Sequence, residues 1–457
     1  MYVLPIGTGI TSSHGFSLVP YKVLSILLLV VAVFVSLPSG VRASPSTGPY
    51  QPHAPIRING DGEFTADNGV SGGSGTASDP FIIQGWNIAS NATPGISVNN
   101  TGAHFIIRNV YVDSTNWPSY SITMTNVTGG AVEDSTIIAV IAIGDSNGIE
   151  IRNIQTDFAG GVLYIDSTSG VQVAGFVGHV YVSSSTDVSM VDNVNGGAFT
   201  AWISDSTNLS LSGDTFLCNP ASTDCTGLHV DNSDNITATN NTFGVDKSIE
   251  VTNSSDLEIS DNHVLQSVTG AIVLGSCTNV SIDGNQVQDG VDAYSGFVKV
   301  TSCDSVNITG NNFSLRSDYN AGELLKISSS GNIAIEGNSF ANSETAVTIS
   351  NTSNVTIDNN NIHSNTQGLV LNNTDHVQVF HNNFVNNTVQ ASEAYSTANT
   401  WDKGYPSGGN FWSDYTGVDN CSGPQQDICT GPDGNGDTPY VFNDNQDNYP
   451  LMQYFNG

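Results

Sequence analysis

The chain has 457 residues, of which 42 are acidic and 10 are basic, and charged residues make up only 11%. With 38% hydrophobic and 8% aromatic residues it has enough apolar material for a core, so it is not an acidic disordered tail. A net charge of −32 disfavours nucleic acid and anionic membranes as partners, and also polyanionic substrates unless a divalent cation bridges them. Neutral glycans and cations remain as candidate ligands.

The N-terminus predicts an exported protein. Residues 23–37 are hydrophobic apart from two serines, follow Lys22 and precede the small-residue stretch 41–43. This pattern is typical of a secretory signal peptide over 1–43. The alternative is an uncleaved membrane anchor, for which the run is shorter than the roughly 20 residues that a span needs. We therefore expect a secreted, periplasmic-type or cell-surface protein.

A repeat of about 22 residues follows. In each unit an apolar residue is followed by a second apolar residue two positions later, by Asn or Asp at position five and by Phe, Val or Ile at position seven. The pattern is V-x-I-x-x-N-x-F. The units begin at Leu209, Ile236, Leu257, Val280, Val306, Ile333, Val355 and Val377. Their position-five residues are Asp214, Asn241, Asn262, Asn285, Asn311, Asn338, Asn360 and Asn382.

The spacing within the repeat predicts the fold. A second apolar pair lies eight and six residues before each unit from Ile236 onward, and this offset never changes. Two short strands joined by a fixed turn, repeated along the chain, predict an all-β, right-handed, single-stranded parallel β-helix of about 14 coils. Valine and isoleucine would fill its interior, with an inward Asn ladder at position five. A β-sandwich or propeller is the alternative.

The repeat also divides the mature chain. Weaker copies of the pattern extend upstream to Phe81. We expect an N-terminal cap over 44–80, β-helix repeats over 81–390 and a loop-rich C-terminal capping module over 391–457.

Long insertions between units offer a ligand site. All length variation falls at one corner of the coil, where 217–227, 288–297 and 314–324 are long. Tyrosines flanked by carboxylates suit a sugar face and its hydroxyls, and solvated loops without a ligand are the alternative. The predicted ligand-binding residues are Asp292, Tyr294, Arg316, Asp318 and Tyr319.

Six cysteines form three close pairs, which predict disulfides in an exported chain. Cys277 and Cys303 both lie three residues before position zero on consecutive coils, where stacking would bring their Cα atoms to about 4.8 Å. The other two pairs close short local loops. These pairs are Cys218 with Cys225 and Cys421 with Cys429.

The C-terminal module contains a candidate calcium loop. Asp433, Asn435 and Asp437 alternate with glycine, and Asp414 and Asp427 lie nearby in the sequence. Oxygen ligands at alternate positions can converge on one cation. Asp-Gly and Asn-Gly are also ordinary turn formers, so a plain turn is the alternative.

Catalysis and copper binding have weaker support. The clustered carboxylates that a β-helix hydrolase needs are missing, and we assign no catalytic residue. Arg316 beside Asp318 is the one basic candidate for a lyase. A copper site is suggested by His363, His376 and His381, although surface histidines more often bind nothing. Sequons such as Asn126 and Asn208 make glycosylation possible in an exported protein.

Several motifs resemble NosD-type right-handed β-helix proteins of the archaeal cell-surface kind. These are 79–86 (DPFIIQGW), the Asn-Asn-Phe repeats, 399–402 (NTWD), 408–415 (GGNFWSDY), 436–440 (GDTPY) and 448–451 (NYPL). The resemblance covers nearly the whole mature chain. It implies a periplasmic or surface location and the carbohydrate-binding and sugar-hydrolase repeat class. Its copper-delivery role does not carry over, since no dense His, Met or Cys site is visible.

The sequence thus predicts a secreted or surface-displayed β-helix that binds glycans or cell-envelope polymers, without catalysis and with calcium as the expected ion. A polysaccharide lyase or glycoside hydrolase is the first alternative. A periplasmic copper-handling accessory protein is the second. No nucleic acid partner and no membrane span after signal cleavage are expected.

Overall fold

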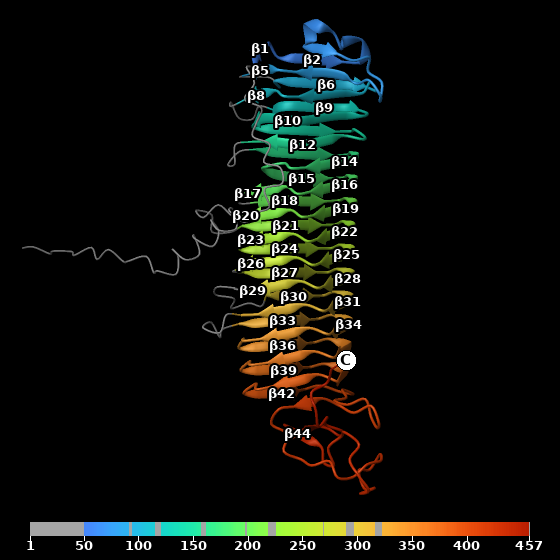
Figure 1. Ribbon diagram of the computed structural model, residues 1–457. Helices are drawn as coiled ribbons and strands as arrows, with labels where there is room; N and C mark the ends of the chain where they lie inside the picture. The colour runs from blue at the N-terminus through green and yellow to red at the C-terminus, as the bar shows by residue number, and fades with distance from the viewer. Residues whose placement is uncertain are drawn as a thin grey trace, which may run out of the picture. The chain divides into compact units, whose positions relative to one another are not determined.

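The computed structural model describes residues 50–90, 94–114, 120–156, 161–196, 199–217, 225–267, 269–288, 297–315 and 322–456. The predicted signal peptide lies outside these residues. The described residues belong to one compact unit, a right-handed parallel β-helix in which each coil pairs with the coils before and after it (Figure 1). The predicted fold is confirmed.

The earlier apolar pair of each repeat lies in a sheet of 15 strands, one per coil. Its strands are β2 (Ile56–Asn59), β6 (Ile96–Thr101), β9 (Tyr120–Val127), β11 (Val140–Gly144), β13 (Val162–Asp166), β15 (His179–Ser183), β18 (Phe199–Ser204), β21 (Thr226–Asp231), β24 (Lys247–Thr252), β27 (Gly270–Gly275), β30 (Val298–Thr301), β33 (Glu323–Ser328), β36 (Thr345–Ser350), β39 (Gln367–Asn372) and β42 (Val389–Ala394).

Positions zero and two lie in a second sheet, of 18 strands. It contains β1 (Gln51–Pro52), β3 (Val70–Gly72), β4 (Phe81–Gln84), β5 (Trp86–Ala89), β7 (Phe105–Arg108), β8 (Tyr111–Asp113), β10 (Gly130–Ile138), β12 (Glu150–Gln155), β14 (Ser169–Ala174), β16 (Thr186–Val191), β19 (Thr207–Ser212), β22 (Asp234–Thr239), β25 (Ser255–Ser260), β28 (Thr278–Asp283), β31 (Asp304–Thr309), β34 (Gly331–Glu336), β37 (Ser353–Asp358) and β40 (Asp375–Phe380).

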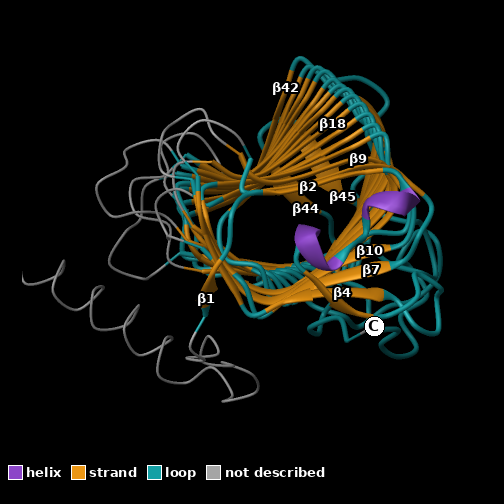
Figure 2. Cartoon of the chain, turned by 90° about the horizontal axis from the view of Figure 1, so that it is seen from above, coloured by secondary structure: helices purple, strands orange, loops and turns teal. Residues whose placement is uncertain are grey.

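Position seven lies in a third sheet of ten short strands. They are β17 (Val194–Gly196), β20 (Thr215–Leu217), β23 (Thr242–Gly244), β26 (His263–Gln266), β29 (Gln286–Gln288), β32 (Asn312–Ser314), β35 (Ser339–Ala341), β38 (Asn361–His363), β41 (Asn383–Val385) and β43 (Phe411–Trp412). Figure 2 shows the sheets surrounding one core in the view from above. Apolar residues at the repeat positions fill this core; Phe216 and Phe243 on consecutive coils stack with ring centroids 4.6 Å apart.

The two ends of the β-helix are covered differently. At the N-terminal end, the 3₁₀ helices η1 (Asp61–Glu63) and η2 (Ala66–Asn68) flank Phe64, whose ring stacks on Phe81 at 4.6 Å. At the other end, Trp412 stacks on Phe384 at 4.4 Å and on Tyr440 at 4.3 Å, and Tyr440 belongs to the hairpin of β44 (Tyr440–Phe442) and β45 (Asn445–Asp447). Strand β2, inside the expected cap, already pairs as the first strand of the 15-stranded sheet.

Buried asparagines at position five form a ladder that links coil to coil. The backbone N–H and Nδ2 of Asn241 both donate to Oδ1 of Asn262, at 3.0 and 3.1 Å, and Nδ2 also donates to the Leu211 carbonyl. The same contacts recur on each coil up to Asn382, so the asparagine ladder fixes the register of successive coils. Its members are Asn193, Asp214, Asn241, Asn262, Asn285, Asn311, Asn338, Asn360, Asn382 and Asn410.

A carboxylate ends the asparagine ladder. The backbone N–H of Asn410 donates to Oδ2 of Asp447 at 2.7 Å, and Trp412 Nε1 donates to the same oxygen at 2.9 Å. Burial raises the pKa of Asp447 to about 7, although these donors and the Tyr449 N–H oppose the rise. Asp447 thereby joins the C-terminal module to the last coil.

A second ladder of hydroxyl groups lies three residues before position zero. Ser233 Oγ donates to the carbonyl of Asp231 at 2.8 Å and accepts the N–H of Ser206, one coil earlier, at 3.2 Å. Each hydroxyl therefore satisfies a buried backbone group on its own coil and another on its neighbour. This hydroxyl ladder contains Ser146, Thr168, Ser185, Ser206, Ser233, Ser254, Ser330 and Thr352.

Asp214 is an acid inside the asparagine ladder. Its Oδ1 accepts both the N–H and Nδ2 of Asn193, at 2.8 and 2.9 Å. Its Oδ2 replaces the Nδ2 donor of an asparagine and makes no hydrogen bond among the described residues. A protonated carboxyl restores the missing donor, and burial raises the pKa of Asp214 to about 7.

We predict that Asp214→Asn stabilises the protein increasingly as pH rises. An unfolded Asp ionises near 3.8 and the folded one near 7, so between these values the unfolded state binds fewer protons and wild-type stability falls with pH. The variant should exceed wild type by about 2 kcal/mol in urea unfolding at pH 8 and by much less at pH 4. Asn241→Asp is the matched control and should show the opposite trend. A pH-independent difference for Asp214→Asn would contradict the prediction.

Candidate functional site

A line of outward side chains crosses the 15-stranded sheet. Each is the middle residue between two inward apolar residues, as Tyr164 is between Leu163 and Ile165, so strand alternation points it to the surface. The strand register pairs each with the next, one coil further on. We call this line the outward column; its members are Tyr164, Tyr181, Trp202, His229, Glu250, Val273, Lys299 and Lys326.

The first half of the outward column is aromatic. The rings of Tyr164 and Tyr181 stack with centroids 5.0 Å apart, and those of Trp202 and His229 lie 3.8 Å apart. Burial raises the pKa of Tyr181, with a further contribution from Tyr164, and Trp202 is 36% exposed. Four consecutive coils therefore present a continuous strip of ring edges and phenol hydroxyls, broad enough to contact an extended ligand.

A polar rim borders this aromatic strip. Two residues beyond each ring, the strands carry Asp166, Ser183, Ser204 and Asp231, which also follow one another by register. Ser183 Oγ donates to Asp166 Oδ1 at 2.6 Å. An apolar strip with hydroxyls and carboxylates along one edge can contact both the carbon face and the hydroxyl groups of a sugar.

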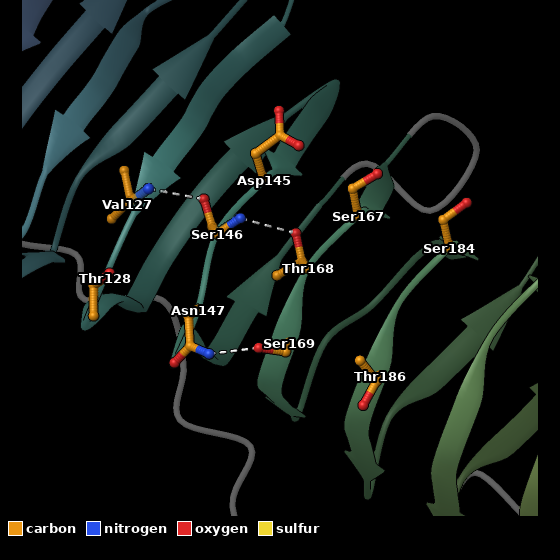
Figure 3. Close-up of a pocket in the computed structure, with 10 residues that line it drawn as sticks. All are labelled: Val127, Thr128, Asp145, Ser146, Asn147, Ser167, Thr168, Ser169, Ser184 and Thr186. Carbon is orange, nitrogen blue, oxygen red and sulfur yellow. Dashed lines mark hydrogen bonds between the residues drawn. The ribbon is translucent and has the colours of Figure 1, made fainter.

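A hollow lies at the corner where β9, β11, β13 and β15 end, so it borders the first two coils of the aromatic strip. Its volume is about 350 Å³, and hydroxyls dominate its lining (Figure 3). Later coils close this corner with asparagine amides, such as Asn235 Nδ2, which donates to Asn208 Oδ1 at 3.0 Å. Gly148 and Gly170 stand at the repeat position of Asn208 and Asn235, so they offer no amide for such a bond. The hollow is lined by Val127, Thr128, Asp145, Ser146, Asn147, Ser167, Thr168, Ser169, Ser184 and Thr186.

The second half of the outward column is charged. Glu250 accepts hydrogen bonds from Lys247 Nζ at 2.8 Å and contacts His229 Nδ1 at 3.2 Å. Although burial raises the pKa of Glu250, these two partners hold it below its ordinary value. Further along, Lys326 Nζ donates to Glu323 at 2.8 Å. This region therefore carries ammonium groups and carboxylates on β24, β30 and β33, while β27 between them contributes the apolar Val273.

The predicted insertion-corner site lies outside the described residues. Asp292, Tyr294, Arg316, Asp318 and Tyr319 all fall in 289–296 or 316–321. Strands β30 and β33 follow these two segments in the sequence and carry Lys299 and Lys326. The outward column was missed from the sequence because its residue type changes from coil to coil. The one signal available in the sequence was the residue between the two inward apolar positions, compared from each repeat to the next.

The three predicted disulfides have different outcomes. Cys421 and Cys429 are bonded, as predicted. Cys225 is disulfide-bonded, and Cys218 lies outside the described residues. The prediction for the remaining two, Cys277 and Cys303, is wrong, because both are free, buried thiols.

The hydroxyl ladder explains the free thiols. Cys277 and Cys303 occupy its positions between Ser254 and Ser330 and act as serines do there. Cys303 Sγ donates to the Thr301 carbonyl at 3.3 Å and accepts the N–H of Cys277 at 3.3 Å. Each sulfur is thus directed at a backbone group, whereas a disulfide needs the two sulfurs directed at each other.

The predicted calcium residues are placed in the C-terminal module. Asp433 Oδ1 accepts the Asn435 N–H at 3.0 Å, and Asp437 accepts those of Asn420 and Cys421, also at 3.0 Å. Asn435 Oδ1 is buried without a hydrogen-bond partner among the described residues. The remaining two candidates do not join this loop by hydrogen bonds: Asp414 accepts Gln390 Nε2 and the Tyr440 hydroxyl, and Asp427 is exposed between Cys421 and Cys429.

Comparison with known protein families assigns the chain to a family. The family model described as periplasmic copper-binding protein (NosD) matches residues 159–333 and 316–417, which together span more than half of the sequence. The chain belongs to the NosD family. A comparison with curated proteins finds no match. Among the described residues, no helix is long and apolar enough to cross a membrane.

Several solved structures are similar to this NosD-family chain at low identity. The A-module of the Azotobacter vinelandii mannuronan C-5 epimerase AlgE6 is 13% identical, with 70% of this chain and 87% of that chain covered and a TM-score of 0.35. The Streptococcus pneumoniae surface adhesin PfbA is 13% identical over 66% and 91%, with a TM-score of 0.35. The Dettilon tailspike protein is 12% identical over 71% and 64%, with a TM-score of 0.36. Such values say nothing about function.

The copper in the NosD description does not fit the described residues. No three His, Cys, Asp or Glu side chains come together there in a way that could hold a metal ion. The predicted histidines occupy three different positions of the coil: His363 ends β38, His376 lies at the corner before position zero, and His381 follows β40. His376 contacts Asp375 at 2.7 Å, and His381 Nε2 contacts the Ser407 carbonyl at 3.0 Å.

We predict that Cys277 and Cys303 are recovered as two alkylated thiols. Unfolding the protein without reductant in iodoacetamide should add two carbamidomethyl groups, both on these residues by peptide mass spectrometry, and folded protein should resist labelling because both thiols are buried. The Cys277→Ser and Cys303→Ser double variant should match wild-type stability within about 1 kcal/mol, because serine suits the ladder. A Cys277–Cys303 crosslinked peptide would contradict the prediction.

Calcium binding in the 433–437 loop stays a prediction. An ion there would give the Asn435 Oδ1 a partner and bridge the flanking carboxylates. Calcium at about 100 times its dissociation constant should then stabilise the protein by about 2.7 kcal/mol, seen as a rise in Tm that EGTA reverses. Asp433→Asn with Asp437→Asn should abolish the rise, and Asp427→Asn tests the exposed candidate. No calcium-dependent change in wild type would reject the site.

Proposed function

We propose that this protein binds a glycan chain of the cell envelope along the outward column, outside the cytoplasm and without cleaving it. The observation that carries the proposal is the aromatic half of the column, where four consecutive coils each contribute a ring to one surface strip. The exported location is supported by the periplasmic description of the family and by the Cys421–Cys429 disulfide.

The strip has the chemistry of a sugar-binding surface. Aromatic side chains provide large apolar contact area at a low cost in conformational entropy, and tyrosine adds a hydroxyl at the wet edge. A sugar ring likewise has an apolar C–H face and a rim of hydroxyls. The polar rim from Asp166 to Asp231 and the hydroxyl-lined hollow supply hydrogen-bond partners beside the rings.

The spacing of the strip favours a linear polymer over a single sugar. Each coil adds about 4.8 Å along the axis, close to the length of one sugar in an extended chain. A chain lying along the axis would meet one side chain of the outward column per coil. Modest contacts on successive coils then add up within one bound chain.

We predict that Trp202→Ala or Tyr181→Ala weakens glycan binding at least tenfold, the loss typical of truncating an aromatic anchor. A glycan array of mature protein would identify the bound sugars, and titration calorimetry would measure affinity. Val370→Ala is the matched control, since Val370 continues the column on β39 away from the rings. Equal losses in the control, or none in either aromatic variant, would contradict the proposed site.

Two further experiments test the two alternatives, a binding site at the insertion corner and a catalytic function. Tyr294→Ala and Tyr319→Ala test the insertion corner. If these variants lose glycan binding and the column variants keep it, the binding site lies at the insertion corner and not on the outward column. Reducing and unsaturated ends are followed in the same samples. New chain ends would establish a hydrolase or lyase and overturn the non-catalytic reading, with the His229 and Glu250 pair and Arg316 as the first residues to mutate.

A further inference from the structure

We propose a second site, where the last coil meets the C-terminal module: Ser407, His381 and Asp358 form a serine–histidine–aspartate group that hydrolyses pendant carboxylic esters. Asp358 ends β37 and His381 directly follows β40, both in the 18-stranded sheet, whereas the outward column lies on the 15-stranded sheet. The inference therefore does not rest on the proposed glycan binding.

His381 departs from the repeat at a turn. The residue four positions after position zero has a positive φ on each coil, and His381 has φ +56° there. Glycine, asparagine and aspartate accept this backbone conformation most easily. A histidine at such a position indicates a role beyond the turn itself. The eight preceding coils follow the preference, with Asp192, Gly213, Asn240, Asp261, Gly284, Gly310, Gly337 and Asn359.

The imidazole of His381 lies between a hydroxyl and a carboxylate. Its Nε2 is 3.2 Å from Ser407 Oγ, and its Nδ1 is 3.5 Å from Asp358 Oδ1. This Oδ1 is buried and has no hydrogen-bond partner among the described residues, so it can accept the Nδ1–H. Contacts between nucleophile, base and orienting group are often long in a free enzyme and shorten when substrate binds.

Two aromatic rings hold the imidazole of His381 in place. Phe455 stacks on it with centroids 4.3 Å apart and planes 10° apart, and Phe380 meets it edge-on at 5.1 Å. The histidine side chain is only 14% exposed, whereas Ser407 is exposed on its turn. A fixed base beside an accessible hydroxyl is the arrangement that attack on an incoming ester requires.

The carbonyl of Ser407 competes for the same ring nitrogen. It lies 3.0 Å from Nε2 of His381, so a proton on Nε2 would be donated to this carbonyl and leave the hydroxyl unactivated. A proton on Nδ1 would instead be donated to the Asp358 carboxylate, and the Nε2 lone pair would then accept the Oγ–H. Asp358 is thus a positioning residue that selects the active tautomer.

The reaction is acyl transfer to Ser407 and then to water. As Oγ bonds to the ester carbonyl carbon, Nε2 of His381 takes its proton, and the C=O electron pair moves onto oxygen. The Ser407 N–H has no acceptor among the described residues and can donate to that oxygen. The C–O bond to the alcohol then breaks, and the leaving oxygen receives the proton. Water repeats the steps on the acyl group, so ester and water give acid and alcohol.

The exposure of Ser407 favours one kind of ester. The acyl group has to project from its carrier to reach a hydroxyl on a surface turn, as a short acyl substituent on a polymer does. The half-buried ring of Phe455 beside the imidazole offers such a group an apolar contact. Removal of a pendant acyl group breaks no bond of the polymer chain, so the activity is compatible with binding that leaves the chain uncut.

The first test is covalent labelling with a fluorophosphonate, whose phosphorus bonds to an activated serine oxygen as fluoride leaves. Peptide mass spectrometry should find the phosphonate on Ser407, and His381→Asn should reduce this labelling roughly a hundredfold. His376→Asn is the matched control, because His376 contacts the Asp375 carboxylate at 2.7 Å without a hydroxyl partner among the described residues. No label on Ser407, or equal labelling in His381→Asn, would overturn the inference.

The second test measures turnover of 4-nitrophenyl acetate. Ser407→Ala should lower kcat roughly a hundredfold and leave the unfolding temperature unchanged, because the hydroxyl is exposed. Asp358→Asn should lower kcat about tenfold at unchanged KM, a split that partial unfolding would not produce. Turnover that survives Ser407→Ala would overturn the inference, even if His381→Asn abolishes it by loosening the C-terminal module. Unchanged kcat in Asp358→Asn would reject the role of Asp358.

Discussion

A one-directional chain of buried amides holds the β-helix in register. Each asparagine from Asn262 to Asn382 receives two hydrogen bonds on Oδ1 from the coil before it and passes two to the coil after it, as Asn262 does between Asn241 and Asn285. A shift of one residue would break every one of these bonds and turn the apolar positions outward. The constant spacing between the two apolar pairs of each repeat reflects this constraint.

Register in turn produces the functional surface. Every coil pairs with its neighbours at the same positions. The outward residue at one repeat position therefore forms a straight line of side chains along the outside of the β-helix. Tyr164, Tyr181 and Trp202 are distant in sequence and adjacent in space for this reason alone. The same geometry brings Lys299 beside Lys326.

The sequence predicted what is invariant from coil to coil and missed what varies. The repeated V-x-I-x-x-N-x-F pattern was sufficient for the fold, the strand positions and the asparagine ladder, since each rests on many equivalent residues. The outward column carries a different residue on almost every coil, so no repeat pattern reveals it. It becomes visible only when the coils are stacked. Cys277 and Cys303 show the converse error: their spacing was read correctly, but their position belongs to the hydroxyl ladder, where sulfur bonds to backbone groups.

The direction of the asparagine ladder also bears on how such chains change length. An internal coil accepts and donates with the same atoms, so a whole coil can be duplicated or lost in frame and the new neighbours still satisfy each other. The terminal rung differs, because Asp447 accepts the Asn410 N–H and has no further coil to supply. A gene for this fold can therefore grow or shrink in units of one repeat within the coils that carry the ladder, from Asn193 to Asn410, while the segment that contains Asp447 must stay at the end. The number of coils, and with it the length of the surface line, is open to change by recombination alone.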